Sequence, residues 1–161
     1  MRKKNILFCI NSMNIGGAEQ LLVDKINNWN ELDNLHLVLF IDITDMLPKI
    51  NRYIKIVKII SKTNLSKINK LRDYLQDNKI DYCFSHLEKS NKISLIASIL
   101  IKTQTIIVIH NINIYEKGSK KEKLAGLIYK LLASKVVAIS DAVFSYLNNE
   151  LNLNSKNIYL I

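Results

Sequence analysis

The sequence predicts an α/β fold in which a Rossmann-like parallel sheet of about seven strands carries helices on both faces. Short apolar segments of strand length recur along the 161-residue chain, as expected for strands that are buried on both faces of a parallel sheet. Segments with apolar residues at helical spacing separate them. Strands that alternate with helices form βαβ units with right-handed crossovers.

The strand candidates are short and rich in β-branched and other apolar residues. The first, Asn5–Ile10, carries no charge. The last runs to the final residue, whereas natural domains usually finish in a polar tail, so we expect the chain to be one half of something longer. The later candidates are Leu35–Ile41, Ile54–Ile60, Ile80–Phe84, Thr105–Ile109, Val136–Ile139 and Ile158–Ile161.

Five apolar stripes at spacings of three and four residues predict the helices. One of them, Ile93–Ile101, is apolar nearly all round, which predicts a buried helix. Lys67 and Lys70 lie off the stripe of the second predicted helix. The remaining stripes are Ala18, Leu21, Leu22, Ile26 and Trp29; Leu65, Ile68, Leu71 and Leu75; Leu124, Leu127, Ile128 and Leu131; and Val143, Tyr146, Leu147 and Leu151.

Composition excludes several classes of protein. With 48% hydrophobic and 23% charged residues, four glycines and one proline, the chain is neither disordered nor collagen-like. Its longest nearly uncharged apolar run is about half of a membrane span, and only about five apolar residues precede Asn11, too few for a signal peptide. Cys9 and Cys83 lie in apolar strand candidates, so we expect buried free thiols and a cytoplasmic protein. No Cys/His spacing indicates zinc.

The net charge of +9 is concentrated in one segment. Three interpretations are open: a solvated lysine face inflated by A/U-rich codon bias, a docking patch for an anionic membrane surface, or a nucleic-acid site. One aromatic residue in the segment and three arginines in the whole chain argue against nucleic acid. Between Met46 and Arg72 there is no acid and there are eight basic residues: Lys49, Arg52, Lys55, Lys58, Lys62, Lys67, Lys70 and Arg72.

A glycine pair follows the first predicted strand. Gly16 and Gly17 stand where that strand leads into a helix, at the sheet edge where ligands of doubly wound folds bind. Backbone N–H groups and the helix dipole favour a phosphate there. The alternative is a tight turn that needs positive φ. The pattern is neither G-x-G-x-x-G nor a P-loop.

Two histidines and a serine also end predicted strands. His86 and His110 would face the same crevice as the glycine pair, where a neutral imidazole can donate or accept a hydrogen bond. The alternative is loop histidines with backbone partners. Ser140 is expected to cap the next helix, which is compatible with contact to a ligand. His36 lies within a strand and is interpreted as structural or solvent-facing.

Five short motifs in this order resemble the N-terminal domain of family 4 glycosyltransferases, which are retaining enzymes of the GT-B architecture. They are Asn14–Glu19 (Asn-Ile-Gly-Gly-Ala-Glu), Ser85-His86, His110-Asn111, Val137–Ser140 (Val-Ala-Ile-Ser) and Lys156–Ile161. The resemblance covers essentially all of residues 1–161. It implies an acceptor-side domain whose partner, a donor-binding Rossmann-like domain that carries most of the nucleotide-sugar site, is absent from this chain.

The resemblance also implies roles for individual residues. His110 matches the catalytic histidine near the reacting sugar. Gly16 and Gly17 match the loop that approaches the donor diphosphate. Asp141 stands where the family often has Glu. The acceptor side is matched by Asn14, Glu19, His86 and Ser140.

The implied reaction is transfer of a sugar, such as a hexosyl group, from a nucleotide-diphosphate sugar to a glycan or lipid-linked acceptor in polysaccharide or glycolipid biosynthesis. Neither a cofactor nor a metal is expected, because no Asp-x-Asp motif occurs and a helix N-terminus can replace a cation at the diphosphate. Such an enzyme would be cytoplasmic or peripheral on the inner face of the membrane. The alternative is a non-catalytic Rossmann-like module, or a truncated remnant, that needs a separate donor-binding domain.

Overall fold

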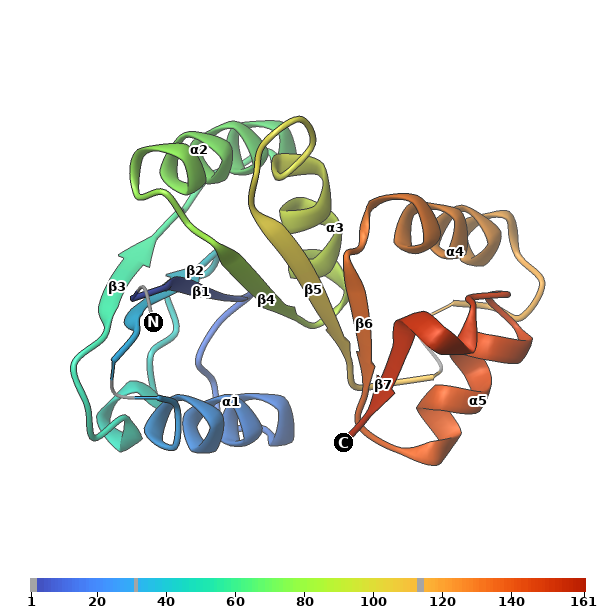
Figure 1. Cartoon of the computed structure of the whole chain (residues 1–161), viewed down its shortest axis with the longest axis horizontal. Coiled ribbons are helices and arrows are strands. Elements are labelled where there is room, and N and C mark those ends of the chain that lie inside the picture. The colour runs from blue at the N-terminus through green and yellow to red at the C-terminus, as the bar shows by residue number, and fades with distance from the viewer. Residues whose placement is uncertain (1–2, 31, 113–114) are drawn as a thin grey trace.

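The computed structural model describes residues 3–30, 32–112 and 115–161 and contains one seven-stranded sheet (Figure 1). The strand order is β3-β2-β1-β4-β5-β6-β7, and every neighbouring pair is parallel. The predicted fold class is therefore confirmed, and each predicted strand overlaps an observed one. The strands are β1 (Asn5–Ile10), β2 (Asn34–Leu39), β3 (Lys55–Lys58), β4 (Tyr82–His86), β5 (Gln104–Ile109), β6 (Lys135–Ala138) and β7 (Ile158–Leu160).

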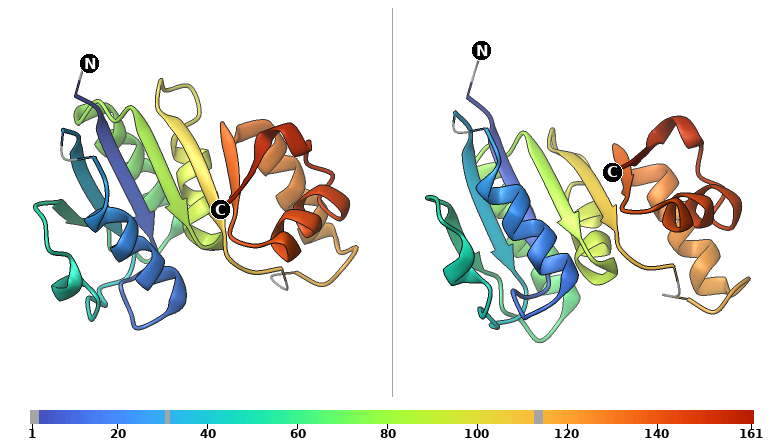
Figure 2. Two further views of the ribbon diagram at one scale, coloured as in Figure 1. Left: turned by 60° about the horizontal axis from the view of Figure 1, so that its bottom comes forward. Right: turned by 90° about the horizontal axis from the view of Figure 1, so that it is seen from below.

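Helices cover both faces of this sheet. α1 lies on one face of β1 and β2, and α2 and α3 lie on the opposite face (Figures 1 and 2). The side chains of Thr63, Ser119 and Ser140 each accept a hydrogen bond from an N–H of the following turn and so begin α2, α4 and α5. The helices are α1 (Gly17–Asn27), α2 (Asn64–Asp77), α3 (Glu88–Ala97), α4 (Lys120–Leu132) and α5 (Asp141–Asn149), with short 3₁₀ turns η1 (Leu47–Lys49) and η2 (Ser155–Asn157).

The strand order reverses between β1 and β4. From β1 the chain runs outward to β2 and β3, returns to β4, and then continues outward on the other side to β7. In an open α/β sheet, the loops that leave the carboxyl ends of the strands diverge at this reversal, and a crevice forms there. We therefore expect a ligand site among the loops that follow β1, β4 and β5.

The core has a separate layer on each face of the sheet. Under α1, Phe8 packs edge-on against Trp29 with ring centroids 5.2 Å apart, and against Phe84 at 5.8 Å. On the other face, the Sγ atoms of Cys9 and Cys83 lie 3.7 Å apart, and both thiols are buried and free, as predicted. Burial raises the pKa of the Cys9 thiol, which keeps it protonated.

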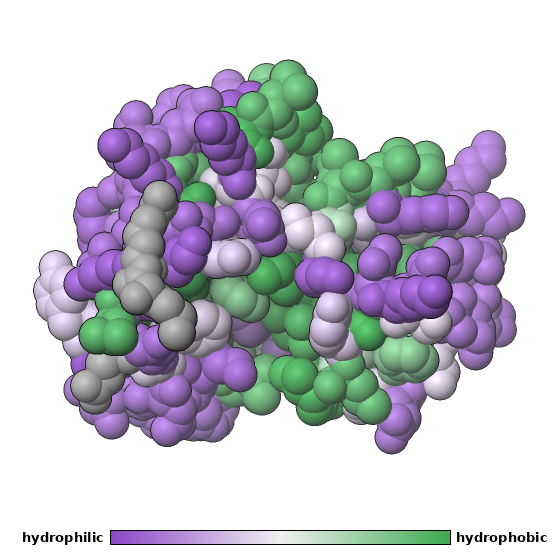
Figure 3. Space-filling model, in the orientation of Figure 1, coloured by the Kyte–Doolittle hydropathy of each residue, from purple (hydrophilic) through white to green (hydrophobic). Residues whose placement is uncertain are grey.

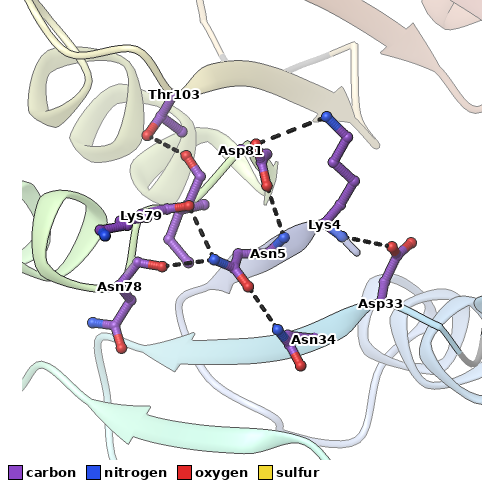
Figure 4. Close-up of polar contacts among 9 residues, drawn as sticks. Lys4, Asn5, Asp33, Asn34, Asn78, Lys79, Asp81 and Thr103 are labelled. Atoms are coloured by element: carbon purple, nitrogen blue, oxygen red, sulfur yellow. Dashed lines mark hydrogen bonds and ion pairs between the residues drawn. The ribbon is translucent and has the colours of Figure 1, made fainter. Parts of the chain in front are cut away.

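A polar network fastens the amino ends of β1, β2 and β4 to one another (Figure 4). The backbone N–H of Asn5 donates to Asp81 Oδ2 at 2.9 Å, and the Asn5 side-chain amide donates to the carbonyl of Asn78 at 3.0 Å. Asn34 Nδ2 in turn donates to Asn5 Oδ1 at 2.8 Å. Because these amides already have hydrogen-bond partners within the protein, they stabilise this edge of the sheet and are not free to bind a ligand.

The buried helix predicted over Ile93–Ile101 is too long at its C-terminal end. α3 ends at Ala97, Ile99 is 38% exposed and Leu100 is fully exposed. Arg72 ends the helix, because its Nη2 and Nε donate to the carbonyls of Ile96 and Ala97 at 3.0 and 3.2 Å. An apolar run alone could not reveal a C-terminus that is fixed by an arginine on another helix.

The stripe predicted for α4 is wrong in its direction. Leu124, Leu127 and Leu131 are 57%, 52% and 69% exposed, and of the predicted stripe Ile128 alone packs partly buried against the core. The cause is a close approach: a Cβ at Gly126 would lie 3.0 Å from the backbone oxygen of Leu151. Leucine side chains do not fit at that distance. The buried residues of α4 are Glu122, Ala125, Gly126 and Tyr129.

Candidate functional site

The glycine pair lies at the start of α1, but not because a tight turn requires it. Gly16 is the N-cap residue with φ −171° and ψ 166°, an extended conformation open to any residue. Gly118 is the glycine with positive φ among the residues that the structure describes, so the alternative interpretation of a positive-φ turn at Gly16 and Gly17 is wrong. A Cβ at Gly16 would lie 2.5 Å from Glu19 Oε2, whereas a Cβ at Gly17 would have nothing within 4 Å.

Gly16 therefore makes room for the carboxylate of Glu19. Glu19 is 8% exposed and lies in the first turn of α1, where a negative charge is stabilised by the helix dipole. A ligand anion at this helix start would share it with that carboxylate. Gly17, in contrast, faces open space. Asn14 is exposed, and its Oδ1 accepts a hydrogen bond from the backbone N–H of Ile15 at 2.8 Å.

His86 and His110 meet directly. The Nδ1 of His86 and the Nε2 of His110 lie 3.2 Å apart, which joins the ends of β4 and β5. His86 is buried at 4% exposure, and His110 is half-buried. In this bond one nitrogen donates and the other accepts. The pair leaves Nδ1 of His110 as the ring nitrogen that is not engaged with His86.

The histidine pair is held in the neutral form. Burial lowers the pKa of His86 to about 3, assisted by the neighbouring charges of His110 and Lys25 when they are protonated. Burial also lowers the pKa of His110 below its usual range. Both rings are uncharged at neutral pH, so they can exchange hydrogen bonds with hydroxyl groups but offer no fixed cation.

The backbone next to the pair is strained. Leu87 has φ 69° and ψ 148°, a region that bulky residues rarely adopt and that costs free energy. It follows His86 directly and is the N-cap of α3, with no side-chain capping bond. Next to it, the Glu88 carboxylate accepts a hydrogen bond from the Tyr115 hydroxyl and pairs with Lys92. Strain of this kind is found where the surroundings fix a functional geometry.

A pocket of about 550 Å³ opens beside His110. The N-terminus of α5 forms one wall, where Ser140 caps the helix by accepting from the Val143 N–H at 3.3 Å. The prediction of a cap is confirmed, and Ser140 is exposed to the pocket. The pocket is lined by Leu87, Glu88, Asn91, Val108, Ile109, His110, Asn111, Ile112, Ser140, Ala142 and Val143.

The sequence interpretation missed Glu88 and Asn91. Asn91 is fully buried, its Nδ2 donates to the Val108 carbonyl at 3.3 Å, and its Oδ1 has no partner among the described residues. Polar residues on a helix predicted to be buried are the sequence signal that could have revealed this role. Two of them also bond within the fold: Ser90 Oγ donates to Asn11 Oδ1 at 3.0 Å, and Ser94 Oγ donates to Ser85 Oγ at 3.1 Å. These bonds attach α3 to the loop after β1 and to β4.

The structure thus brings together only part of the predicted site. His86, His110 and Ser140 converge on the ends of β4, β5 and β6, and His110 and Ser140 line the pocket. The glycine pair begins α1 at the same carboxyl edge of the sheet. The pocket itself combines the N-terminus of α5, a neutral imidazole and the half-buried Glu88 carboxylate, and the glycine pair is not among its lining residues.

A larger cavity, about 860 Å³, lies at the opposite edge of the sheet. Its walls include Asn5 and Asn34, which bond to each other, and His36, whose Nδ1 lies 2.7 Å from the Tyr74 hydroxyl. Burial, and then the charge of Lys55, lowers the pKa of His36. His36 is therefore structural, as predicted. Because these side chains already have partners, this cavity is a weaker candidate than the carboxyl edge.

Part of the basic segment is engaged within the protein. Lys67 is buried at 5% exposure, and its Nζ donates to the Phe40 carbonyl at 3.0 Å. Burial lowers the pKa of its ammonium group. Arg52 Nη1 donates to the Trp29 carbonyl at 2.7 Å, and Arg72 is used at the end of α3. Three of the eight cations thus serve the fold rather than a partner.

The described parts of the chain contain neither a metal-binding cluster nor a membrane-spanning helix. Across residues 3–30, 32–112 and 115–161, no three His, Cys, Asp or Glu side chains gather in a way that could hold a metal ion. No helix in the same parts is both long and apolar enough to cross a membrane.

Comparison with known proteins identifies the fold. Neither a protein-family model nor a curated protein matches the chain. Among solved structures, it is similar to Anabaena Alr3699/HepE in complex with UDP and glucose, with a TM-score of 0.80 and 18% identity over 97% of this chain and 43% of HepE. The lipopolysaccharide outer core galactosyltransferase WaaB follows with a TM-score of 0.72, 15% identity, and 96% and 44% coverage.

A third structural neighbour has a different activity. The UDP-GlcNAc 2-epimerase from Methanocaldococcus jannaschii matches with a TM-score of 0.64 and 10% identity, over 99% of this chain and 45% of the epimerase. The chain spans less than half the length of each of these proteins. Its fold is therefore a Rossmann-like domain of the kind found in GT-B glycosyltransferases, and a related fold also serves an epimerase.

Proposed function

We propose that this chain is the acceptor-side N-terminal domain of a retaining family 4 glycosyltransferase. The enzyme would transfer a sugar from a nucleotide-diphosphate sugar to a glycan or lipid-linked acceptor. Its donor-binding half would be a second Rossmann-like domain. The fold shared with WaaB and with UDP-bound HepE supports the class, and the five sequence motifs support the family.

The observation that carries the proposal is the His86–His110 pair at the mouth of a pocket. His110 is half-buried beside about 550 Å³ of space, and the buried ring of His86 holds it at 3.2 Å. A neutral imidazole fixed in this way is suited to hydrogen-bond a sugar hydroxyl and hold it in reacting geometry. An imidazole without such a partner could rotate and would not hold the hydroxyl in that geometry.

The other residues then take distinct roles. His110 is the group that would touch the reacting sugar. His86, buried behind it, would position His110 rather than contact the acceptor. Ser140 and the N-terminus of α5 would line the acceptor side. Glu88, whose carboxylate is already held by Tyr115 and Lys92, would accept a bond from an acceptor hydroxyl.

The donor diphosphate would approach the start of α1 at Gly17 rather than at Gly16. Gly17 has open space where a side chain would stand, and Gly16 is covered by the Glu19 carboxylate. Free N–H groups at a helix start bind anions without a metal ion, in keeping with the expectation that no metal is needed. Glu19 would be displaced, or would accept a sugar hydroxyl, when the diphosphate arrives.

The alternative is a non-catalytic Rossmann-like module, or a remnant without transfer activity. The reading frame that follows the codon of Ile161 discriminates between them. A continuous frame that encodes a second Rossmann-like domain supports the enzyme. A stop codon at that point favours the alternative.

Product analysis tests which reaction the complete enzyme catalyses. The complete enzyme is incubated with a panel of nucleotide sugars and extracted glycan and lipid acceptors, and products are identified by mass spectrometry. The proposal expects a glycosylated acceptor with retained anomeric configuration. Epimerised nucleotide sugar without transfer would reject the proposal in favour of the activity of the third structural neighbour.

A further inference from the structure

Exposed apolar side chains of α4 and of the loop that follows α3 lie on the same side of the molecule, and we call them the apolar ridge. The ridge consists of Leu124, Leu127 and Leu131, together with Ile99 and Leu100 of the loop. All five are more than a third exposed, and Leu100 is fully exposed. α4 and this loop lie along the upper side of Figure 1, and Figure 3 shows apolar surface over both.

The exposed leucines of α4 lie on the side of the helix opposite its buried residues. Leu124 and Leu131 are seven residues apart, about two helical turns, so they share one side of α4. Tyr129, which is buried, lies two residues from both Leu127 and Leu131, about half a turn around the helix. The helix therefore packs one face and presents a separate leucine stripe to solvent.

Lysines border the ridge, and no exposed acid of α4 opposes them. The one acid of α4, Glu122, is buried and accepts hydrogen bonds from the Gly118 N–H and the Tyr146 hydroxyl. An apolar stripe between lysines is the pattern of a helix that lies in a membrane interface. The bordering lysines, all exposed, are Lys102, Lys120, Lys121, Lys123 and Lys130.

The backbone of the loop also favours an outward apolar side chain. Leu100 has φ 65°, a conformation in which leucine is rare and asparagine or glycine is common. The side chain makes no use of the protein interior, since it is fully exposed. Neither packing nor backbone preference accounts for leucine here, whereas contact with an apolar phase does.

We propose that this ridge docks the domain on an anionic lipid surface. Leucines enter the boundary between headgroups and acyl chains, and the lysines bind the negative headgroups. A second copy of the chain fits less well, because a symmetric contact would place lysines against lysines. Nucleic acid fits less well too, because it would leave five apolar side chains exposed.

This surface differs from the Lys49–Arg72 segment, in which Arg52, Lys67 and Arg72 are engaged within the fold. The ridge proposal does not depend on the proposed function. If the two hold together, the loop between β5 and α4 connects His110 to the docked helix, and a lipid-linked acceptor could reach the pocket from the membrane.

The test is co-sedimentation of the 161-residue chain with vesicles of phosphatidylcholine, with and without about a third phosphatidylglycerol. We expect binding to the anionic vesicles at low salt and weaker binding at high salt. The triple variant Leu124→Gln, Leu127→Gln and Leu131→Gln should lower the partition coefficient about fivefold per leucine. Replacing Lys123 and Lys130 with glutamine should lower it about fivefold per lysine.

A matched control replaces Lys62 and Lys70, exposed lysines of the earlier segment, and should leave binding unchanged. Leu100→Asn should weaken binding while it leaves thermal unfolding unchanged or raises its midpoint, which separates docking from stability. No binding of the wild-type chain at low salt would overturn the proposal. So would equal binding by the leucine variant, or a dimer in sedimentation velocity that this variant abolishes, since a second copy would then be the occupant.

Discussion

Acidification is expected to destabilise the fold through His86. Its pKa is about 3 in the folded protein because the ring is buried, and about 6.5 when the chain is unfolded. Above the unfolded value both states are neutral and the ring contributes fully to stability. As the pH falls below it, the unfolded chain binds the proton first, so stability is lost progressively until the folded pKa is reached.

The size of this loss follows from the separation of the two pKa values. One unit corresponds to about 1.4 kcal/mol, so His86 alone removes about 2 kcal/mol between about pH 7.5 and pH 5, and about 3 kcal/mol by pH 4. The pKa values of His36 and His110 are also lowered by burial and act in the same direction. The total free energy of unfolding of a small domain is only about 5–15 kcal/mol.

The assay is urea unfolding of wild type and His86→Asn at several pH values. Asparagine places an amide near the position of the ring Nδ1 and keeps a bond to His110 feasible, but it does not titrate. Comparing each protein with itself across pH cancels the packing cost of the substitution. His36→Asn is the matched control. This variant should still lose, on acidification, the part of the free energy of unfolding that His86 contributes.

The reasoning is refuted in two ways. The wild-type free energy of unfolding could remain constant between about pH 7.5 and pH 5, which would mean that His86 is not neutralised by burial. Alternatively, His86→Asn could lose as much as wild type, which would assign the acid sensitivity to other groups.

The glycines give further predictions. Gly126→Ala should cost about 1–3 kcal/mol, measured by urea unfolding, because its Cβ would lie 3.0 Å from the rigid backbone oxygen of Leu151; stability equal to wild type would show that α4 can move away freely. Gly16→Ala should cost about 1 kcal/mol, because alanine caps poorly and its Cβ displaces the Glu19 carboxylate. Gly17→Ala, which meets nothing, should keep full stability but raise the donor KM of the complete enzyme. A normal donor KM would remove Gly17 from the diphosphate site.

The sheet could be predicted from sequence because its signal is local. Most strands are short, mainly apolar runs such as Asn5–Ile10, for which the prediction and the structure agree on the bounds. Strand-ending residues such as His86 and His110 were predicted to share a crevice because parallel strands deliver their ends to one edge. Their direct contact confirms that they are neighbours.

Other features depend on contacts between distant segments, which no local pattern encodes. α4 turns its leucines outward because Gly126 meets Leu151. Lys67 is buried because the Phe40 carbonyl needs a donor. The hydrogen bond of Asn91 to the Val108 carbonyl was not predictable for the same reason, since it forms only when α3 packs beside Val108. Periodicity shows that a helix has an apolar face, but not which of two faces the tertiary structure buries.

The most direct test of the proposed function is sugar transfer by His110→Ala in the complete enzyme, with kcat and the donor KM measured separately. If His110 orients the reacting groups, kcat falls about 100-fold or more, while the donor KM stays within about threefold, since the donor binds mainly to the other domain. Turnover near the wild-type rate would contradict the account.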